Sequence, residues 1–139
     1  MSARLSLPES SLRAGGTVTA QLIVQNNTGH ALHFIGCGAP FQILLSGPDD
    51  KPTPAWAGCA TRMTVRVGTS TYRVPVKATY NACTSDGGNG TPACGSDGKP
   101  PPLPAGDYVV TTYAVSTKLP VPSEASLTVV PQGTDPASA

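Results

Sequence analysis

The sequence is poor in charge. Only 12% of its 139 residues are Asp, Glu, Lys or Arg, and 9 basic residues nearly balance 8 acidic ones. So small a charged fraction argues against a solvent-exposed helical bundle or a coiled coil. The net charge is near zero, so the chain lacks the excess of basic residues that is typical of nucleic-acid binders. We therefore expect no nucleic-acid partner.

Long apolar runs are also absent. No stretch of about 18 or more apolar residues occurs, so we expect no membrane-spanning segment in this chain. Residues 1–8 lack the apolar core of a secretory signal. Two interpretations fit this start: a cytoplasmic protein, or a natural form with a signal peptide, lipid anchor or membrane helix before Met1.

The motifs of common enzymes and cofactor sites are missing. There is no Gly-x-Ser-x-Gly motif, no EF-hand loop and no phosphate-binding loop that opens a helix. The histidines, His30 and His33, fall in a turn and a strand, a spacing that does not put both on one strand face. We therefore predict that the protein is not an enzyme and holds neither a metal nor a cofactor.

Four cysteines are present, an even number in a short chain, which is consistent with two disulfides. Three pairings are possible, and we prefer Cys37–Cys59 with Cys83–Cys94, because the second bond would close a Gly-rich stretch that cannot order itself by burial. Zinc binding by all four thiolates is disfavoured by their wide spacing. Free buried cysteines are the other alternative. Two disulfides favour an extracytoplasmic location: secreted, lipoprotein or the outer domain of a membrane-anchored protein.

Glycine and proline are abundant, at 15 residues each, and they separate short runs in which polar and apolar residues alternate. This pattern predicts an all-β chain, with strands over residues 17–26, 31–35, 41–45, 61–67, 72–80, 108–117 and 124–130. Residues 61–67 and 72–80 are close enough in sequence to form a hairpin. Pro75 cannot donate to a ladder, so its strand is expected at a sheet edge or at a bulge.

The connections are equally distinctive. Residues 51–59 form a loop with two prolines and Trp56, and residues 83–105 form a longer one that ends in an extended proline-rich stretch. We predict one domain over residues 1–130 and a disordered tail over residues 131–139. The domain is expected to be a monomer.

Parts of the chain resemble bacterial immunoglobulin-like domains. Residues 17–34 (TVTAQLIVQNNTGHALHF) read as a strand that ends in Asn-Asn-Thr-Gly before a second short strand, and residues 103–110 (LPAGDYVV) contain a Pro-x-Gly-x-Tyr entry to a late strand. Residues 34–43 (FIGCGAPFQI) are similar to the bacterial intracellular proteinase inhibitor (BsuPI) type. The resemblance implies an immunoglobulin-like β-sandwich of about seven to nine mostly antiparallel strands.

The functional expectation follows from this fold. We expect a non-catalytic module of the bacterial cell envelope that binds another protein or an envelope polymer. The alternative is a proteinase inhibitor that uses an exposed loop, although no inhibitory residue carries over from the similar family.

The expected binding surfaces are the loop over residues 36–40 with Trp56, and the 83–105 loop on the other side, because loops on a rigid scaffold commonly bind ligands. The predicted hairpin would also gather a basic stripe on one sheet face, made of Arg62, Arg66, Arg73 and Lys77.

Overall fold

The computed structural model describes residues 1–48, 51–56, 58, 60–88 and 90–133. Over these residues the protein is all-β, with no helix and therefore none that is long and apolar enough to cross a membrane. The strands are β1 (Ser2–Ser6), β2 (Ser11–Arg13), β3 (Thr17–Asn26), β4 (Leu32–Gly36), β5 (Phe41–Ser46), β6 (Thr61–Val65), β7 (Gly68–Lys77), β8 (Gly106–Ala114) and β9 (Ala125–Val130).

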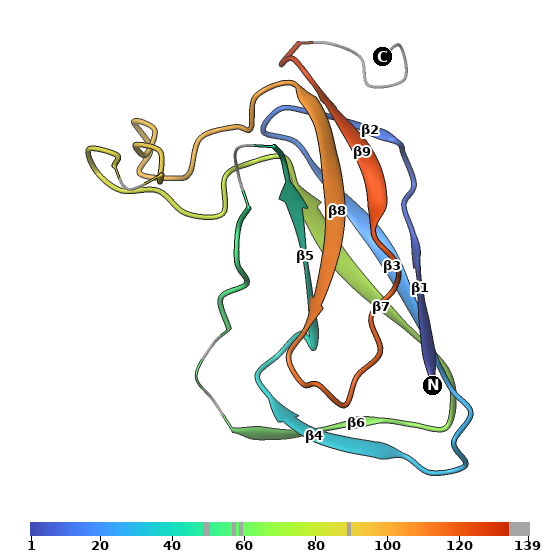
Figure 1. Cartoon of the computed structure of the whole chain (residues 1–139). Helices are drawn as coiled ribbons and strands as arrows, with labels where there is room; N and C mark the ends of the chain where they lie inside the picture. Colours follow the sequence, from blue (N-terminus) through green and yellow to red (C-terminus); the bar gives the residue numbers. More distant parts are fainter. Residues whose placement is uncertain (49–50, 57, 59, 89, 134–139) are drawn as a thin grey trace.

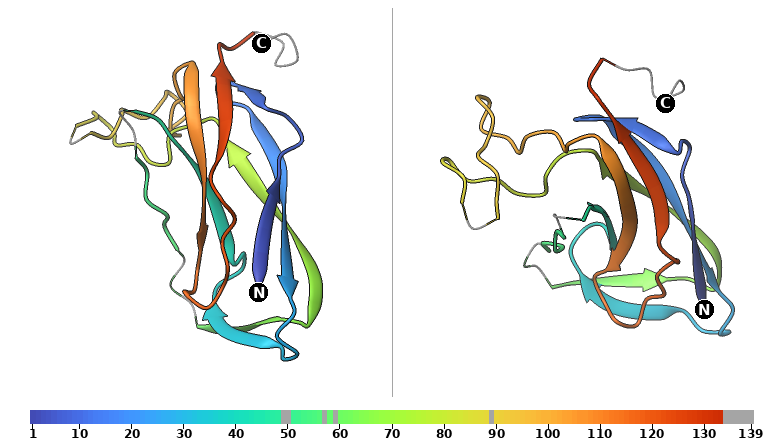
Figure 2. Two further views of the ribbon diagram at one scale, coloured as in Figure 1. Left: turned by 45° about the vertical axis from the view of Figure 1, so that its right-hand side comes forward. Right: turned by 45° about the horizontal axis from the view of Figure 1, so that its top comes forward.

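The described strands form three sheets (Figure 1). The order β1-β3-β7 forms one sheet and β2-β9-β8-β5 forms a second, and the two face each other across a single core. Strands β4 and β6 form a two-stranded ribbon, which crosses the lower end of both sheets (Figure 2). Among the described strands, every pairing is antiparallel except that of β2 with β9, which confirms the mostly antiparallel prediction.

Alternation places the apolar side chains between the two large sheets. On β3 the even positions from Val18 to Val24 face inward, while Thr17, Thr19 and Gln21 face solvent. Strand β7 follows the same rule and lies at a sheet edge, as predicted from Pro75, which is paired only with Thr19 of β3. The core that results includes Ala20, Leu22, Val24, Phe41, Ile43, Leu45, Val74, Val76, Val110, Leu127 and Val129.

The predicted hairpin between residues 61–67 and 72–80 is wrong. Strand β6 pairs with β4, and β7 pairs with β3 over its whole length. The β3–β7 ladder ends where the β4–β6 ladder begins. Asn26 lies opposite Gly68 at the end of the first, and Leu32 lies opposite Val65 at the start of the second. The chain therefore bends at this corner and carries β4 and β6 away from the main sheet as a separate ribbon.

Asn26 and Gly68 build this corner. The Asn26 side chain is fully buried, and its amide donates hydrogen bonds to the carbonyl oxygens of His30 (2.9 Å) and Val65 (3.3 Å). Its Oδ1 accepts from the backbone N–H and the hydroxyl of Thr28. Gly68 has a φ of +100°, a conformation that strains any residue with a side chain. Strand β3 ends at Asn26, as predicted from the alternation over residues 17–26.

Several strand boundaries differ from the prediction. Strand β6 ends at Val65, so Val67 is 51% exposed instead of facing the core. Strand β7 begins at Gly68 and β8 ends at Ala114. The prediction missed β1 and β2, which are short and carry few apolar residues. Residues 134–139 of the predicted disordered tail lie outside the described residues.

Candidate functional site

The Cys83–Cys94 disulfide is confirmed. No described cysteine has a free thiol, Cys37 included. Cys59 lies outside the described residues, so the Cys37–Cys59 pairing stays a prediction. Only one of the two predicted disulfides is therefore shown. The described residues also contain no group of three or more His, Cys, Asp or Glu arranged to hold a metal ion.

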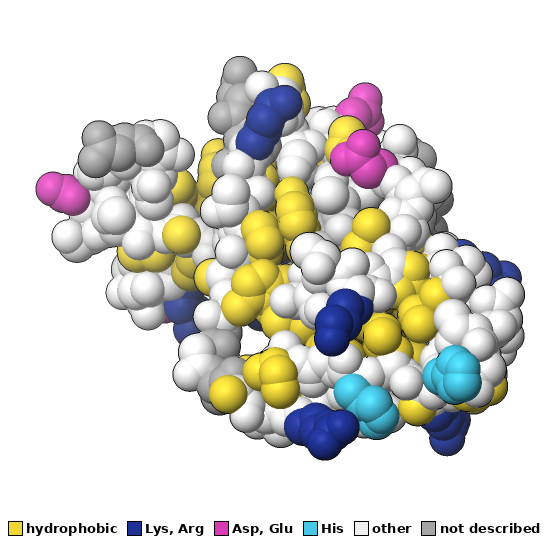
Figure 3. Space-filling model, turned by 60° about the horizontal axis from the view of Figure 1, so that its bottom comes forward, with side chains coloured by type: hydrophobic (Ala, Val, Ile, Leu, Met, Phe, Trp, Pro, Cys, Tyr) yellow, Lys and Arg dark blue, Asp and Glu magenta, His cyan; other side chains and the backbone are white. Residues whose placement is uncertain are grey.

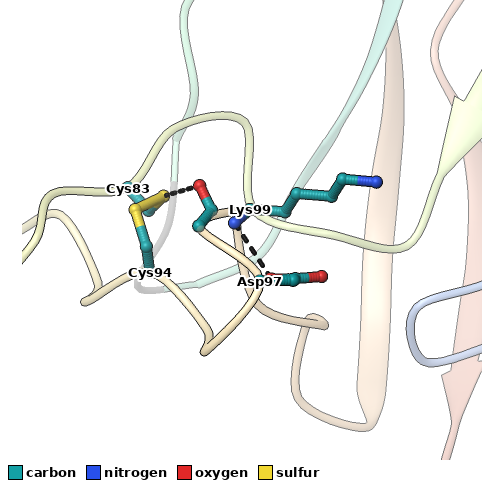
Figure 4. Close-up of a disulfide and its surroundings, with 5 residues drawn as sticks. Cys83, Cys94, Asp97 and Lys99 are labelled. Atoms are coloured by element: carbon teal, nitrogen blue, oxygen red, sulfur yellow. Dashed lines mark hydrogen bonds between the residues drawn. A yellow bond between two sulfur atoms is a disulfide. The ribbon is translucent and has the colours of Figure 1, made fainter.

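The disulfide divides the 83–105 loop into a tip and a base. The described residues of the tip, 84–88 and 90–93, project from the body (Figure 1), and Thr84 and Ala93 form a bridge beside the disulfide. The base begins with a turn over residues 95–99, in which Gly98 N–H donates to Gly95 O and Lys99 N–H donates to the Asp97 carboxylate at 3.0 Å. The Cys83 sulfur contacts the Gly98 carbonyl oxygen across 4.0 Å. The disulfide thus packs against the turn (Figure 4).

The rest of the base extends along the end of β7. Tyr80 N–H donates to Pro101 O, and Leu103 N–H donates to Ala78 O. Thr79 forms a bridge with Pro102. These contacts confirm an extended conformation for the proline-rich stretch and hold it beside the body.

A groove of about 750 Å³ lies between the base of the loop and the open edges of the two large sheets. All five residues from Phe41 to Leu45 line it, so the groove follows the edge strand β5 along most of its length. The opposite wall consists of the end of β7 and the proline-rich stretch. Its apolar and proline lining residues include Phe41, Ile43, Leu45, Pro52, Val74, Pro75, Tyr80, Pro100 and Pro102.

Polar groups are spaced along this lining. Lys77 on β7 and Lys99 in the turn supply positive charge, and Asp97 supplies one negative charge. Figure 4 shows the side chains of Asp97 and Lys99 pointing away from the disulfide. Asn81 and Gln42 add amides, which also hold the segment over residues 51–56: Asn81 donates to Thr53 O at 3.0 Å, and Gln42 donates to Ala55 O.

The loop residues that we predicted on two opposite sides partly meet in this one groove. Ala39, from the 36–40 loop, lines it together with residues 97, 99, 100 and 102 of the long loop. Trp56 is half-buried in the 51–56 segment and does not line the groove. Of the groove's charged residues, only Lys77 was named as a candidate from sequence. Asp97 and Lys99 carry no local signal beyond turn and linker composition.

The predicted basic stripe is divided between two parts of the molecule. Arg73 and Lys77 are exposed on the outer face of β7, whereas Arg62 is exposed on β6 and Arg66 at the corner that follows it. The stripe required β6 and β7 to be neighbours, and they pair with different strands.

One ionisable group near this corner is perturbed. Burial raises the pKa of the Tyr72 phenol above its ordinary value, and the nearby Arg66 guanidinium partly opposes that rise. The Tyr72 ring packs edge-on against Phe41, with the ring centroids 5.3 Å apart. Tyr72 therefore serves the packing between the two large sheets.

The histidines do not form a pair. Both are exposed, and the Nδ1 atom of His33 lies 3.0 Å from the hydroxyl of Thr64 across the ribbon.

The chain matches no protein-family model, and neither the curated proteins nor the solved structures contain a significant match to it.

Proposed function

We propose that this protein is a non-catalytic binding module that takes an extended segment of a partner protein in the groove beside β5. The observation that carries the proposal is the shape of the groove. It follows consecutive residues of an edge strand, Phe41 to Leu45, and is closed on its other side by β7 and the proline-rich stretch.

An edge strand has backbone N–H and C=O groups on its open side, and an extended peptide can pair with them. In such binding the main chain supplies affinity, and pockets for alternate side chains supply specificity. Apolar side chains of such a peptide can contact the lining residues that keep exposed surface, which include Leu44, Pro75, Tyr80 and Pro102. Because Lys77 and Lys99 outnumber Asp97, a segment with an acidic residue is favoured.

An immunoglobulin-like β-sandwich is the fold that we propose for the scaffold. The order β1-β3-β7 corresponds to strands A-B-E of that fold, and β5-β8-β9 corresponds to C-F-G. The Tyr108 hydroxyl near the start of β8 donates to the Pro104 carbonyl oxygen at 2.7 Å. A tyrosine bonded to upstream backbone at this position is a hallmark of the fold.

The Cys83–Cys94 disulfide is compatible with an oxidising compartment. We therefore propose an extracytoplasmic, monomeric module of the bacterial cell envelope, whose partner is another envelope protein. An envelope polymer remains the alternative ligand, and the following experiment separates the two.

The test is a selection from a random peptide library on the native protein, followed by affinity measurements on the enriched peptides. Thr79→Trp fills the groove, because Thr79 lines it. Thr19→Trp is the matched control, since Thr19 is exposed on the outer face of β3. We expect enriched peptides with an acidic residue, bound at least about tenfold more weakly by Thr79→Trp and equally well by Thr19→Trp.

Failure to enrich any peptide would contradict the proposal, and so would equal affinity for the native protein and Thr79→Trp. Binding of a soluble cell-wall glycan probe in the groove, with no peptide enriched, would favour the polymer instead.

Inhibition of a proteinase is a second candidate, favoured by the tip of the long loop. Residues 84–88 and 90–93 project from the body, and the disulfide joins the two ends of this tip at its base (Figure 1). A rigid projecting loop loses little conformational entropy when it enters a cleft. A panel of serine proteinases assayed with micromolar protein tests this candidate, with a variant that lacks residues 85–92 as the control. Full residual activity throughout the panel would exclude it.

A further inference from the structure

Among the residues that the structure describes, the lower end of the molecule carries basic and no acidic residues. This end, which we call the ribbon end, consists of residues 27–36, 61–67 and 115–123. It contains His30, His33, Arg62, Arg66 and Lys118, and no Asp or Glu. The carboxylate nearest in sequence, that of Glu124, accepts a hydrogen bond from Thr111 on β8.

Hydrogen bonds and packing hold the three segments of the ribbon end together. Lys118 Nζ donates to the His33 carbonyl oxygen at 3.4 Å. Gly36 lies so close to Val115 and Met63 that a Cβ atom there would meet the Met63 sulfur at 2.9 Å. The ribbon is thus packed directly on the segment that joins β8 to β9.

The outward face of the ribbon is well defined by its register. Ile35 lies opposite Arg62, and His33 lies opposite Thr64, so these four exposed side chains share one face. The other face of the ribbon presents Phe34 and Val65 to the core. Arg62 and His33 therefore lie on the face of the ribbon that is turned away from the core. The view of this end shows Lys, Arg and His side chains on its surface (Figure 3).

Exposed aliphatic side chains accompany these charges. Four large hydrophobic residues are notably exposed in the described chain, and three of them belong to the ribbon end: Ile35 (58%), Val67 (51%) and Val121 (50%). A single exposed aliphatic residue is ordinary, but their concentration at a cationic end is not. Figure 3 shows hydrophobic side chains among Lys, Arg and His, with the acidic side chains at the margin of the view.

We propose that the ribbon end docks on the surface of a bilayer that contains anionic phospholipid. Arginine and lysine are attracted to the negative headgroups, and shallow insertion of the exposed aliphatic side chains removes apolar surface from water. The exposed groups stand on a two-stranded ribbon across the end of the molecule (Figures 1 and 2), so they can reach a broad surface together.

A bilayer fits these residues better than a protein partner does. The centres of protein interfaces are enriched in Tyr and Trp. The ribbon end has neither, and its one aromatic residue, Phe34, is buried. Dispersed cations and aliphatic side chains need no matched pockets on a fluid, negatively charged surface.

Vesicle co-sedimentation tests the charge requirement, using phosphatidylcholine vesicles with and without about one third phosphatidylglycerol. The native protein should bind the anionic vesicles, and added salt should weaken the binding. Arg62→Gln with Arg66→Gln should bind about thirtyfold more weakly. The matched control is Arg4→Gln with Arg73→Gln, on the exposed face of β1 and β7, and its binding should equal that of the native protein.

A second pair of variants tests the apolar requirement. Ile35→Ser with Val121→Ser should weaken binding by about tenfold and remove the part that persists at high salt. Val109→Ser is the control, because Val109 is 41% exposed on β8, outside the ribbon end. The substituted side chains are exposed, and thermal unfolding checks that every variant is folded.

Three results would overturn the proposal. The first is no binding to the anionic vesicles, which would leave an acidic protein as the occupant of this end. The second is equal binding to neutral and anionic vesicles. The third is an equal loss of binding in the Arg62/Arg66 and Arg4/Arg73 variants, which would show attraction by total charge instead of by the ribbon end.

Discussion

At the residue scale, Asn26 is the most connected polar side chain at the corner of the fold. It is fully buried, yet its amide and carbonyl groups are satisfied by His30, Val65 and Thr28. A buried polar group with all its partners stabilises one arrangement of the chain and penalises others. Here that arrangement is the bend that separates the ribbon from the main sheet.

Replacing Asn26 with Ala should lower the free energy of unfolding by about 3 kcal/mol, because buried backbone groups lose their partners. Urea unfolding measures this change. Asn27→Ala, at the exposed neighbouring position, should stay within about 0.5 kcal/mol of the native protein. Equal stabilities for the two variants would show that the corner does not depend on Asn26.

The raised pKa of Tyr72 predicts that the folded protein loses stability at alkaline pH. Because burial raises its pKa in the folded state above the ordinary 10.0, the unfolded chain loses this proton first as the pH rises. The stability that the neutral Tyr72 phenol contributes is fully present below pH 10.0 and is lost as the pH rises above that value. Tyr72→Phe has no such proton, so its stability should fall less between about pH 9 and about pH 11. Urea unfolding measures both proteins at the two pH values. An equal fall in the free energy of unfolding for the native protein and for Tyr72→Phe would contradict this assignment.

At the scale of the elements, the sequence predicts which face of a strand is buried better than it predicts which strands pair. Alternation identified the inward residues of β3, β5 and β7, since burial on one face of a strand repeats every two residues. It gave no information on which strand pairs with which, so β6 was joined to β7 by proximity although it pairs with β4. The groove was not predictable, because its walls come from edges that are distant in sequence.

The disulfide at the base of the long loop should stabilise both the fold and the groove. Replacing Cys83 and Cys94 together with Ala should cost up to about 3 kcal/mol on the chain-entropy estimate and weaken peptide binding, because the Asp97–Lys99 turn loses its neighbour. Urea unfolding and peptide affinity measure the two effects. Ser85→Ala, an exposed change inside the same loop, is the control. Unchanged peptide affinity in the double variant would show that peptide binding in the groove does not depend on the disulfide.

On the scale of the whole molecule, charge is unevenly distributed although the net charge is only +1. The ribbon end has cations without carboxylates, whereas the groove mixes Lys77 and Lys99 with Asp97. The two surfaces therefore suit different ligands, and the ribbon end leaves the groove free. A module docked on a bilayer by the ribbon end would keep the groove open to a partner.

Groove binding is the central claim, and amide chemical shifts of the isotope-labelled protein, titrated with a library-selected peptide, test it most directly. The predicted result is a set of shifts confined to residues 41–45, the end of β7 with Lys77, and the turn with Asp97 and Lys99. Shifts centred on the loop tip at residues 84–93, or on the ribbon end, with the groove unchanged, would contradict the claim.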